Sequence, residues 1–372
     1  MKLLLVTGIF PPDIGGPATY MPRLAESLVE AGESVELITL SDELDGEQTN
    51  YPVTRIKRRQ GAKRRSAQVV KAITAQAGNA DLIFANGLFG EVQEANQLLR
   101  KPQVNKLVGD YAWEFASRKR LTKQDMIGFN QQKNPFYKIL RQRRNYPATV
   151  ADVLITPSQF FKNIVRNWGF EVNRIEVIAN GVEVPPLSRT QDLPYDYIAC
   201  IGRLIPLKRL DLAIRLLGEL PPEYHLVIVG DGPLKKQLGR LACKLGVELR
   251  VHFLGALPFG QTFSVLKKAK ALLQLSQTET FSHTTIEAMA AGVPVIAAKV
   301  GGIAEIISHE KDGVLLDVVN GASLKSAIIT LIRDENRTAR LTENAQTTFK
   351  RYTWANCFNK TYQLIKEVAG CP

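Results

Sequence analysis

The chain has 372 residues, a net charge of +12, 45% hydrophobic residues and 23% charged residues. This length predicts two domains rather than one core, and the composition excludes a disordered chain. No apolar run approaches the ~20 residues that a transmembrane helix needs. The start, MKLLLVTGIFPPDIGG, does not resemble a signal peptide, and the four cysteines show no paired spacing. We therefore expect a cytoplasmic protein with reduced thiols.

Short β-rich runs alternate with helical patterns along the chain. Predicted strands lie at 2–7, 34–40, 81–86, 103–109, 152–158, 195–202, 225–232, 250–255, 269–276 and 294–298. An amphipathic helix is predicted at 17–32, and similar patterns separate most later strands. Strands that alternate with helices at this spacing predict parallel sheets with helices on both faces. The fold class is therefore α/β, with two doubly wound, Rossmann-like domains facing a central cleft.

The expected division between these domains lies in a proline-rich stretch at 180–194, where the strand pattern restarts. The N-terminal domain is predicted to cover 1–185 and the C-terminal domain 190–350. A last helical pattern follows the second sheet, and we expect this helix, within 352–372, to return to the first domain.

Two glycines follow the first predicted strand, in PPDIGGPATY. Gly15 and Gly16 leave the backbone free to approach a ligand, and the next helix presents its N-terminal amides there. Taken alone, such a pair more often marks a tight turn than a phosphate-binding loop. The three spaced glycines of a dinucleotide site are absent from this loop, so a nicotinamide site has little support.

The basic excess of the chain lies in one segment. Residues 51–150 hold 20 Lys or Arg and 6 Asp or Glu, a charge of +14, whereas the remainder has 28 and 30, a charge of −2. The densest run is RIKRRQGAKRR at 55–65, and KILRQRRN at 138–145 is a second basic cluster. A solvated basic face and a surface for an anionic partner both explain this pattern. The residues we select as candidates for membrane binding are Arg58, Arg59, Arg64 and Arg65.

Ligands of open parallel sheets bind at the carboxyl ends of the strands, so the loops after the predicted strands at 195–202 and 269–276 are candidate sites. Arg203 and Lys208 follow the first of these strands, where they could clamp a diphosphate. Two solvated cations are the alternative.

Two glutamates surround the start of a predicted helix in SQTETFSHTTIEAMAAGVPVIA, residues 276–297. Glu279 lies on the loop before this helix, and Glu287 lies about one turn inside it. The backbone amides at the helix start would point at a bound anion, and they belong to Phe281, Ser282, His283 and Thr284. The glutamates could then accept hydrogen bonds from hydroxyls on either side of the phosphates. A helix cap with an exposed acid explains one glutamate but not both.

GRLIPLKRLD followed by ETFSHTTIEAMAAGVPVIA closely resembles the retaining glycosyltransferases of the large GT4 family, also called glycosyl transferases group 1. The two glutamates match the E-x7-E signature of this family. The resemblance extends over most of the chain and is strongest over 198–316. It implies a GT-B fold, with the acceptor bound mainly by the N-terminal domain and the nucleotide-sugar by the C-terminal domain.

By this resemblance, Arg203 and Lys208 match the diphosphate-binding pair of the family. Glu287 matches the glutamate that holds the ribose, Glu279 the one that contacts the transferred sugar, and Gly16 the glycine near the donor phosphates.

Two positions depart from the family pattern. Ser282 stands where the family has glycine, and Gly109-Asp110 stands where many members have His-Asp. Asp110 is retained as a catalytic candidate beside Glu279, Arg203 and Lys208, but the role usually given to the histidine has no counterpart.

The resemblance implies retaining transfer of a hexose-type sugar from a UDP- or GDP-sugar to a lipid-linked or glycan acceptor, in cell-surface polysaccharide or glycolipid synthesis. The sequence does not identify the sugar, the base or the acceptor. No cofactor is expected. The chain has no Asp-x-Asp motif and its four histidines lack ligand spacing, so no metal is expected either.

Because members of this family commonly glycosylate lipid-linked acceptors, we expect the acceptor domain to dock peripherally on the inner face of an anionic membrane. A soluble acceptor with a merely solvated basic face is the alternative. Two other classes of protein remain: a nucleotide-sugar epimerase of similar architecture, and a basic nucleic-acid-binding protein. No nucleic-acid-binding module and no basic-aromatic interleaving support the last, so no nucleic-acid partner is expected.

Overall fold

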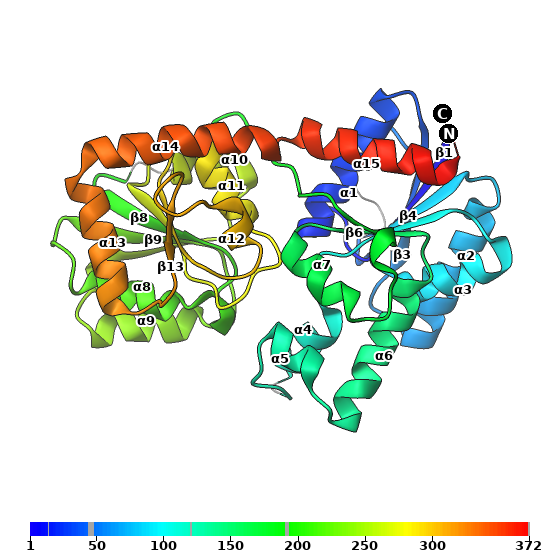
Figure 1. Ribbon diagram of the computed structural model, residues 1–372, viewed down its shortest axis with the longest axis horizontal. Helices are drawn as coiled ribbons and strands as arrows, with labels where there is room; N and C mark the ends of the chain where they lie inside the picture. Colours follow the sequence, from blue (N-terminus) through cyan, green and yellow to red (C-terminus); the bar gives the residue numbers. More distant parts are fainter. Residues whose placement is uncertain (14, 44–47, 120, 190–192, 371–372) are drawn as a thin grey trace. The chain divides into compact units, whose positions relative to one another are not determined.

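The computed structural model (Figure 1) describes residues 1–13, 15–43, 48–119, 121–189 and 193–370. The chain forms two compact units. Unit 1 contains Met1–Ala179 and Cys357–Pro372, and unit 2 contains Asn180–Asn356. In the described residues, no helix is both long enough and apolar enough to span a bilayer.

Unit 1 is built on a parallel sheet that, in the part of the chain described, has seven strands in the order β3-β2-β1-β4-β5-β6-β7. The strands are β1 (Lys2–Thr7), β2 (Ser34–Ser41), β3 (Val53–Lys57), β4 (Leu82–Asn86), β5 (Gln103–Lys106), β6 (Val153–Thr156) and β7 (Ile175–Val177). The helices are α1 (Gly16–Glu30), α2 (Ala62–Ala77), α3 (Phe89–Leu99), α4 (Tyr111–Arg118), α5 (Met126–Gln131), α6 (Pro135–Thr149) and α7 (Gln159–Arg166). Strands such as β4 are buried along their whole length because helices cover both faces of the sheet.

Three helices of unit 1 depart from the regular alternation. Between β5 and β6 the chain forms α4, α5 and α6 in succession, and we call residues 111–150 the excursion. In Figure 1 the excursion extends away from the sheet of unit 1.

Unit 2 has a second parallel sheet, with six strands among the described residues in the order β10-β9-β8-β11-β12-β13. The strands are β8 (Asp196–Ile201), β9 (Tyr224–Val229), β10 (Val251–Gly255), β11 (Ala271–Gln274), β12 (Val295–Ala298) and β13 (Val314–Leu316). The helices are α8 (Leu210–Leu217), α9 (Lys235–Lys244), α10 (Phe259–Lys267), α11 (His283–Ala291), α12 (Ile303–Ile306), α13 (Gly321–Arg333) and α14 (Glu335–Phe349). The predicted α/β class with two doubly wound parallel sheets is confirmed.

The last helix, α15 (Trp354–Ala369), begins in unit 2 and continues into unit 1 from Cys357 onward. The Thr361 hydroxyl lies 3.2 Å from the Tyr20 hydroxyl of α1, and Tyr362 donates a hydrogen bond to Glu33. These contacts confirm the predicted return of the C-terminal helix to the first domain.

Three strands are missing from the sequence analysis: β3, β7 and β13. Each lies at an edge of its sheet. Strand β3 contains Arg55 and Lys57, the start of the basic run, and charged side chains are typical of edge strands because they discourage pairing with other chains. Strands β7 and β13 have three residues each, too few for a recognisable pattern.

Candidate active site

The predicted donor-binding residues of unit 2 lie on two neighbouring strand ends. Strands β8 and β11 are hydrogen-bonded partners in the sheet, so the loops that follow them meet at the same edge. Arg203 follows β8 and is exposed, and Lys208 closes the short 3-10 helix Pro206–Lys208 in the same loop. Glu279 lies on the loop after β11, just before α11.

Lys208 and Glu279, 71 positions apart in the chain, form an ion pair. The Glu279 carboxylate also accepts a hydrogen bond from the Ser276 hydroxyl at 2.9 Å and from the Gln274 amide at 3.2 Å. The exposed fractions of the two paired side chains are 22% and 17%. The pair is therefore oriented by the fold and remains accessible to a ligand.

Glycines allow the loops at this edge of the sheet of unit 2 to pack closely against one another. A Cβ on Gly230, whose φ is +132°, would stand 2.0 Å from the Gly202 carbonyl oxygen. A Cβ on Gly302 would stand 2.4 Å from the Thr280 carbonyl oxygen, and the Gly302 amide donates to the Glu279 carbonyl at 2.9 Å. Sequence reasoning missed Gly302, although the Gly-Gly pair that follows the buried β12 after two intervening residues was a signal for such an approach.

The N-terminus of α11 is capped by Ser282, the residue that departs from the family pattern. Its hydroxyl oxygen accepts hydrogen bonds from the Thr285 amide at 3.3 Å and from the Thr285 hydroxyl at 2.9 Å. The amides of His283 and Thr284 occupy the first two helical positions, where an α-helix offers no carbonyl partner of its own. Phe281 is buried, and its ring is nearly perpendicular to that of His283 at a centroid distance of 5.5 Å.

Glu287 lies one turn inside α11, as predicted from the sequence. Its side chain keeps some exposure, yet the surrounding protein removes enough water to raise the pKa of its carboxyl group to about 7. Near neutral pH this group can therefore both donate and accept hydrogen bonds, which suits a contact with paired hydroxyls.

Gly15 and Gly16 lie in unit 1, where Gly15 is the N-cap of α1 with a φ of +156°. A Cβ on Gly15 would come within 2.9 Å of the Ile9 side chain, whereas no atom lies within 4 Å of one built on Gly16. The backbone at Gly16 is therefore open to a ligand.

Asp110, in unit 1, is fully buried and is the N-cap of α4. Its carboxylate accepts hydrogen bonds from the Trp113 amide at 3.0 Å and the Asn130 side chain at 2.8 Å, and it forms an ion pair with Arg144. These contacts join α4, α5 and α6, so the observed role of Asp110 is to anchor the excursion. Its catalytic role stays a prediction.

The four arginines selected as membrane contacts differ in exposure. Arg58 forms an ion pair with Asp13 and donates to the Leu40 carbonyl at 2.9 Å, so it is used within unit 1. Arg59 is 86% exposed, and Arg64 is exposed in the first turn of α2. Arg65 is half-buried.

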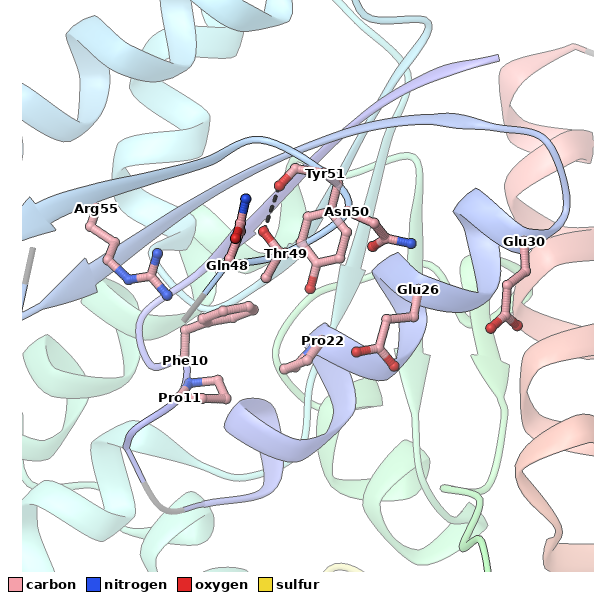
Figure 2. A pocket seen from close by; sticks show the side chains of 10 residues that line it. All are labelled: Phe10, Pro11, Pro22, Glu26, Glu30, Gln48, Thr49, Asn50, Tyr51 and Arg55. Atoms are coloured by element: carbon pink, nitrogen blue, oxygen red, sulfur yellow. Dashed lines mark hydrogen bonds between the residues drawn. The ribbon is translucent and has the colours of Figure 1, made fainter. Parts of the chain in front are cut away.

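Unit 1 also contains a pocket of about 350 Å³ between α1, the start of β3 and the segment before it (Figure 2), which the sequence did not predict. The Arg55 guanidinium lies over the Phe10 ring at 5.5 Å from its centroid. Tyr51 is 5% exposed, its hydroxyl has no hydrogen-bond partner among the described residues, and burial raises its pKa to about 12.

Solved structures share this architecture. The structure of Anabaena HepE in complex with UDP and glucose matches with a TM-score of 0.80 at 22% identity, covering 99% of this chain and 100% of HepE. WaaG, a glycosyltransferase involved in lipopolysaccharide biosynthesis, matches with a TM-score of 0.70 at 17% identity, covering 98% of this chain and 99% of WaaG. The fold is therefore GT-B, with two domains that each contain a parallel sheet.

Residues 14–184 match the family model of Glycosyltransferase Family 4, and residues 189–348 match that of Glycosyl transferases group 1. The chain belongs to this GT4-type family of glycosyltransferases.

Relatives of this chain are also named as glycosyltransferases. An uncharacterized glycosyltransferase of Methanocaldococcus jannaschii is 29% identical over 225 residues, which are 60% of this chain and 62% of the relative. A second one from the same organism is 25% identical over the full length of both chains. The D-inositol 3-phosphate glycosyltransferase of Rhodococcus jostii is 31% identical over 51% of this chain and 47% of the relative. The match thus spans less than two thirds of the first and third of these relatives.

Proposed function

We propose that this protein is a retaining glycosyltransferase that moves a hexose-type sugar from a UDP- or GDP-sugar to a lipid-linked or glycan acceptor in cell-surface polysaccharide or glycolipid synthesis. The observation that carries the proposal is the Lys208–Glu279 ion pair beside the N-terminus of α11. In this proposal the Lys208 ammonium binds phosphate and the Glu279 carboxylate binds sugar hydroxyls, at the edge of the sheet where β8 and β11 end.

In this proposal each group of the site has a separate task. Arg203, Lys208 and the amides of His283 and Thr284 bind the diphosphate, Glu287 holds the ribose, and Glu279 holds hydroxyls of the transferred sugar. When the bond between the anomeric carbon and the phosphate oxygen breaks, negative charge develops on the diphosphate. Fixed positive charge and oriented amides stabilise it there without reorganising, which is the main source of catalysis.

The comparisons support a nucleotide-sugar donor at a coarse level. HepE is described in complex with UDP and glucose and in complex with UDP-glucose. A UDP-sugar is therefore the first donor to test, with GDP-sugars second.

The proposal is tested by release of free nucleotide. Thermal-shift screening against nucleotide-sugars identifies the donor, because a ligand that binds the folded state raises its stability. Acceptor-dependent release of UDP or GDP, with a product of retained anomeric configuration, supports the proposal, and turnover without an acceptor contradicts it. Since no metal is proposed, EDTA should leave the rate unchanged, and inactivation would contradict that part.

We also propose that unit 1 docks on the inner face of an anionic membrane, where a lipid-linked acceptor would lie. The +14 charge of residues 51–150 supports this, as do the exposed side chains of Arg59 and Arg64. Basic residues near an anionic surface contribute about 1 kcal/mol each, an effect that falls off within a Debye length.

Glu287→Ala should raise the KM for the nucleotide-sugar with a smaller effect on kcat. The ribose hydroxyls do not change during the reaction, so their contacts stabilise the bound substrate and the transition state alike. Steady-state kinetics at varied donor concentration measure both parameters. An unchanged KM with a greatly lowered kcat would contradict the ribose assignment.

Glu287→Gln should change the pH dependence of stability. The pKa of Glu287 is raised from 4.5 to about 7 in the folded protein, so the folded state binds the extra proton between these values. The contribution of the protonated Glu287 carboxyl group to the free energy of unfolding is fully present below about pH 4.5. It is lost as the pH rises through 7. We expect the wild type to lose up to about 3 kcal/mol more than the variant between about pH 5 and pH 8. Urea unfolding at both pH values measures the free energy of unfolding of the wild type and the variant. An equal change in this free energy for the two proteins would contradict the raised pKa.

A further inference from the structure

Helix α6 of the excursion has an unusual arrangement of apolar and polar side chains. Phe136, Ile139, Tyr146 and Val150 are 47%, 51%, 63% and 43% exposed. They follow one another at i, i+3, i+10 and i+14, the spacing of a single stripe along a helix. These side chains therefore lie along one face of α6, and we call these four residues the α6 stripe. At the C-terminal end of the stripe, Tyr146 and Val150 also line a cavity of about 680 Å³ with residues at the end of α3, including its C-cap Arg100.

The opposite face of α6 packs on the rest of unit 1 through polar contacts and one aromatic contact, in which the Tyr137 ring lies 5.4 Å from the Phe129 ring between centroids. Arg141 donates to the carbonyls of Phe129 and Gln132 at 2.7 and 2.6 Å. Arg144 is buried, paired with Asp110 and stacked over Trp168 at 3.7 Å from the ring centroid. At 3.6 residues per turn, position 141 lies about half a turn from the centre of the stripe and position 144 about a third of a turn. A surface helix of a soluble protein normally packs its apolar side chains on the protein and leaves its polar ones in water.

Exposed apolar side chains gather elsewhere on the excursion too. Of the sixteen large hydrophobic residues exposed in the described chain, eight lie within the excursion. They are Tyr111, Phe115, Leu121, Ile127, Phe136, Ile139, Tyr146 and Val150. Such a concentration in a short segment marks an interaction surface.

The charge of the excursion identifies the partner. Residues 111–150 contain nine Lys or Arg and two Asp or Glu, a charge of +7. A symmetric contact with a second copy would set these positive side chains against each other. An anionic bilayer instead offers negative headgroups to the basic side chains and an acyl boundary to the aromatic and aliphatic ones.

We propose that the α6 stripe inserts into the headgroup and acyl boundary of an anionic membrane and is the main membrane anchor of this protein. The proposal rests on the membrane docking of unit 1 proposed above and assigns it to the excursion rather than to the basic run at 55–65. Lys138 and Arg143, close to the stripe, then extend to the headgroups while their aliphatic stems lie along the apolar surface.

Flotation of the full-length protein with phospholipid vesicles tests the proposal. Vesicles of phosphatidylcholine alone are compared with vesicles that also contain phosphatidylglycerol. The stripe variant combines Phe136→Ser, Ile139→Ser and Tyr146→Ser, and the matched control combines Leu98→Ser and Leu249→Ser, two side chains that are each 84% exposed outside the excursion. A third variant combines Arg59→Ser and Arg64→Ser.

We expect the stripe variant to partition into anionic vesicles on the order of 100-fold less than the wild type, because three apolar side chains no longer leave water. The control should bind like the wild type. The arginine variant should lose only part of its binding, and at about 0.5 M salt, where charges are screened beyond a few ångströms, it should match the wild type.

Three results would overturn the proposal: flotation of the stripe variant equal to that of the wild type, no wild-type binding to anionic vesicles, or a wild-type dimer in lipid-free buffer that the stripe substitutions dissociate. Thermal shift with the nucleotide-sugar and transfer to a water-soluble acceptor are measured on the same variants. Both should be unchanged in the stripe variant, so failure of the membrane anchor is distinguished from failure of the proposed transferase activity.

Discussion

Glu279→Ala and Arg203→Ala should each lower the transfer rate by a factor on the order of 10² to 10³. Arg203 is exposed beside the end of β8, and its loss removes a positive charge from the leaving diphosphate. Glu279 is held by Lys208, Ser276 and Gln274, and its loss frees the sugar hydroxyls that it would bind.

Both variants should remain folded, because neither side chain belongs to the core of unit 2. Thermal unfolding checks this, and Arg215→Ala and Glu343→Ala, substitutions of exposed residues of unit 2, are the matched controls. Glu279→Gln separates the effect of charge from that of side-chain size. The glutamine has the same length and can form hydrogen bonds, but it cannot form the ion pair with Lys208. Near wild-type turnover in either alanine variant would remove that residue from the site.

Asp110→Ala should destabilise the protein by about 3–5 kcal/mol, because it leaves the buried Arg144 guanidinium without its counter-charge. It also removes the cap of α4 and the contact with Asn130. Chemical unfolding, followed by tryptophan fluorescence, measures the loss.

Asp125→Ala is the matched control for this substitution. Asp125 is also a helix N-cap, of α5, accepting from the Gly128 amide at 2.7 Å, but it is exposed and unpaired with any described cation. It should cost only about 1 kcal/mol. An Asp110→Leu/Arg144→Leu double variant should recover much of the stability lost in Asp110→Ala, because no buried charge is left alone. A stable but inactive Asp110→Ala would contradict the anchoring role and favour a catalytic one.

The sequence predicts the parts of this fold whose pattern is local. Apolar runs such as β4 and β11 are recognisable because strands buried on both faces contain few polar residues. The edge strand β3 is not recognisable in this way, because its outer positions carry Arg55 and Lys57. The position of Glu287 inside α11 follows from the helix pattern alone.

The contacts of the site depend on residues far apart in the chain and could not be predicted in the same way. The sequence suggested separate tasks for Lys208 and Glu279, and only the pairing of β8 with β11 brings them together. Arg144 reads as one more member of the basic cluster at 138–145, yet it is buried, because Asp110 and Trp168 lie against its side of α6. Which face of an amphipathic helix meets the protein is decided by the partner surface, not by the helix.

The ion pair and hydrogen bonds that attach α6 to the rest of unit 1 affect how the protein responds to a change of solvent. Hydrophobic contacts weaken in detergent or lipid, because an apolar medium competes for the same surfaces, whereas buried ion pairs and hydrogen bonds grow stronger as the local dielectric constant falls. A helix held by Asp110–Arg144 and by the donors of Arg141 therefore keeps its place when its outer face leaves water. The attachment of the excursion and the affinity of its outer face for lipid can then vary independently, so one can be altered by substitution without loss of the other.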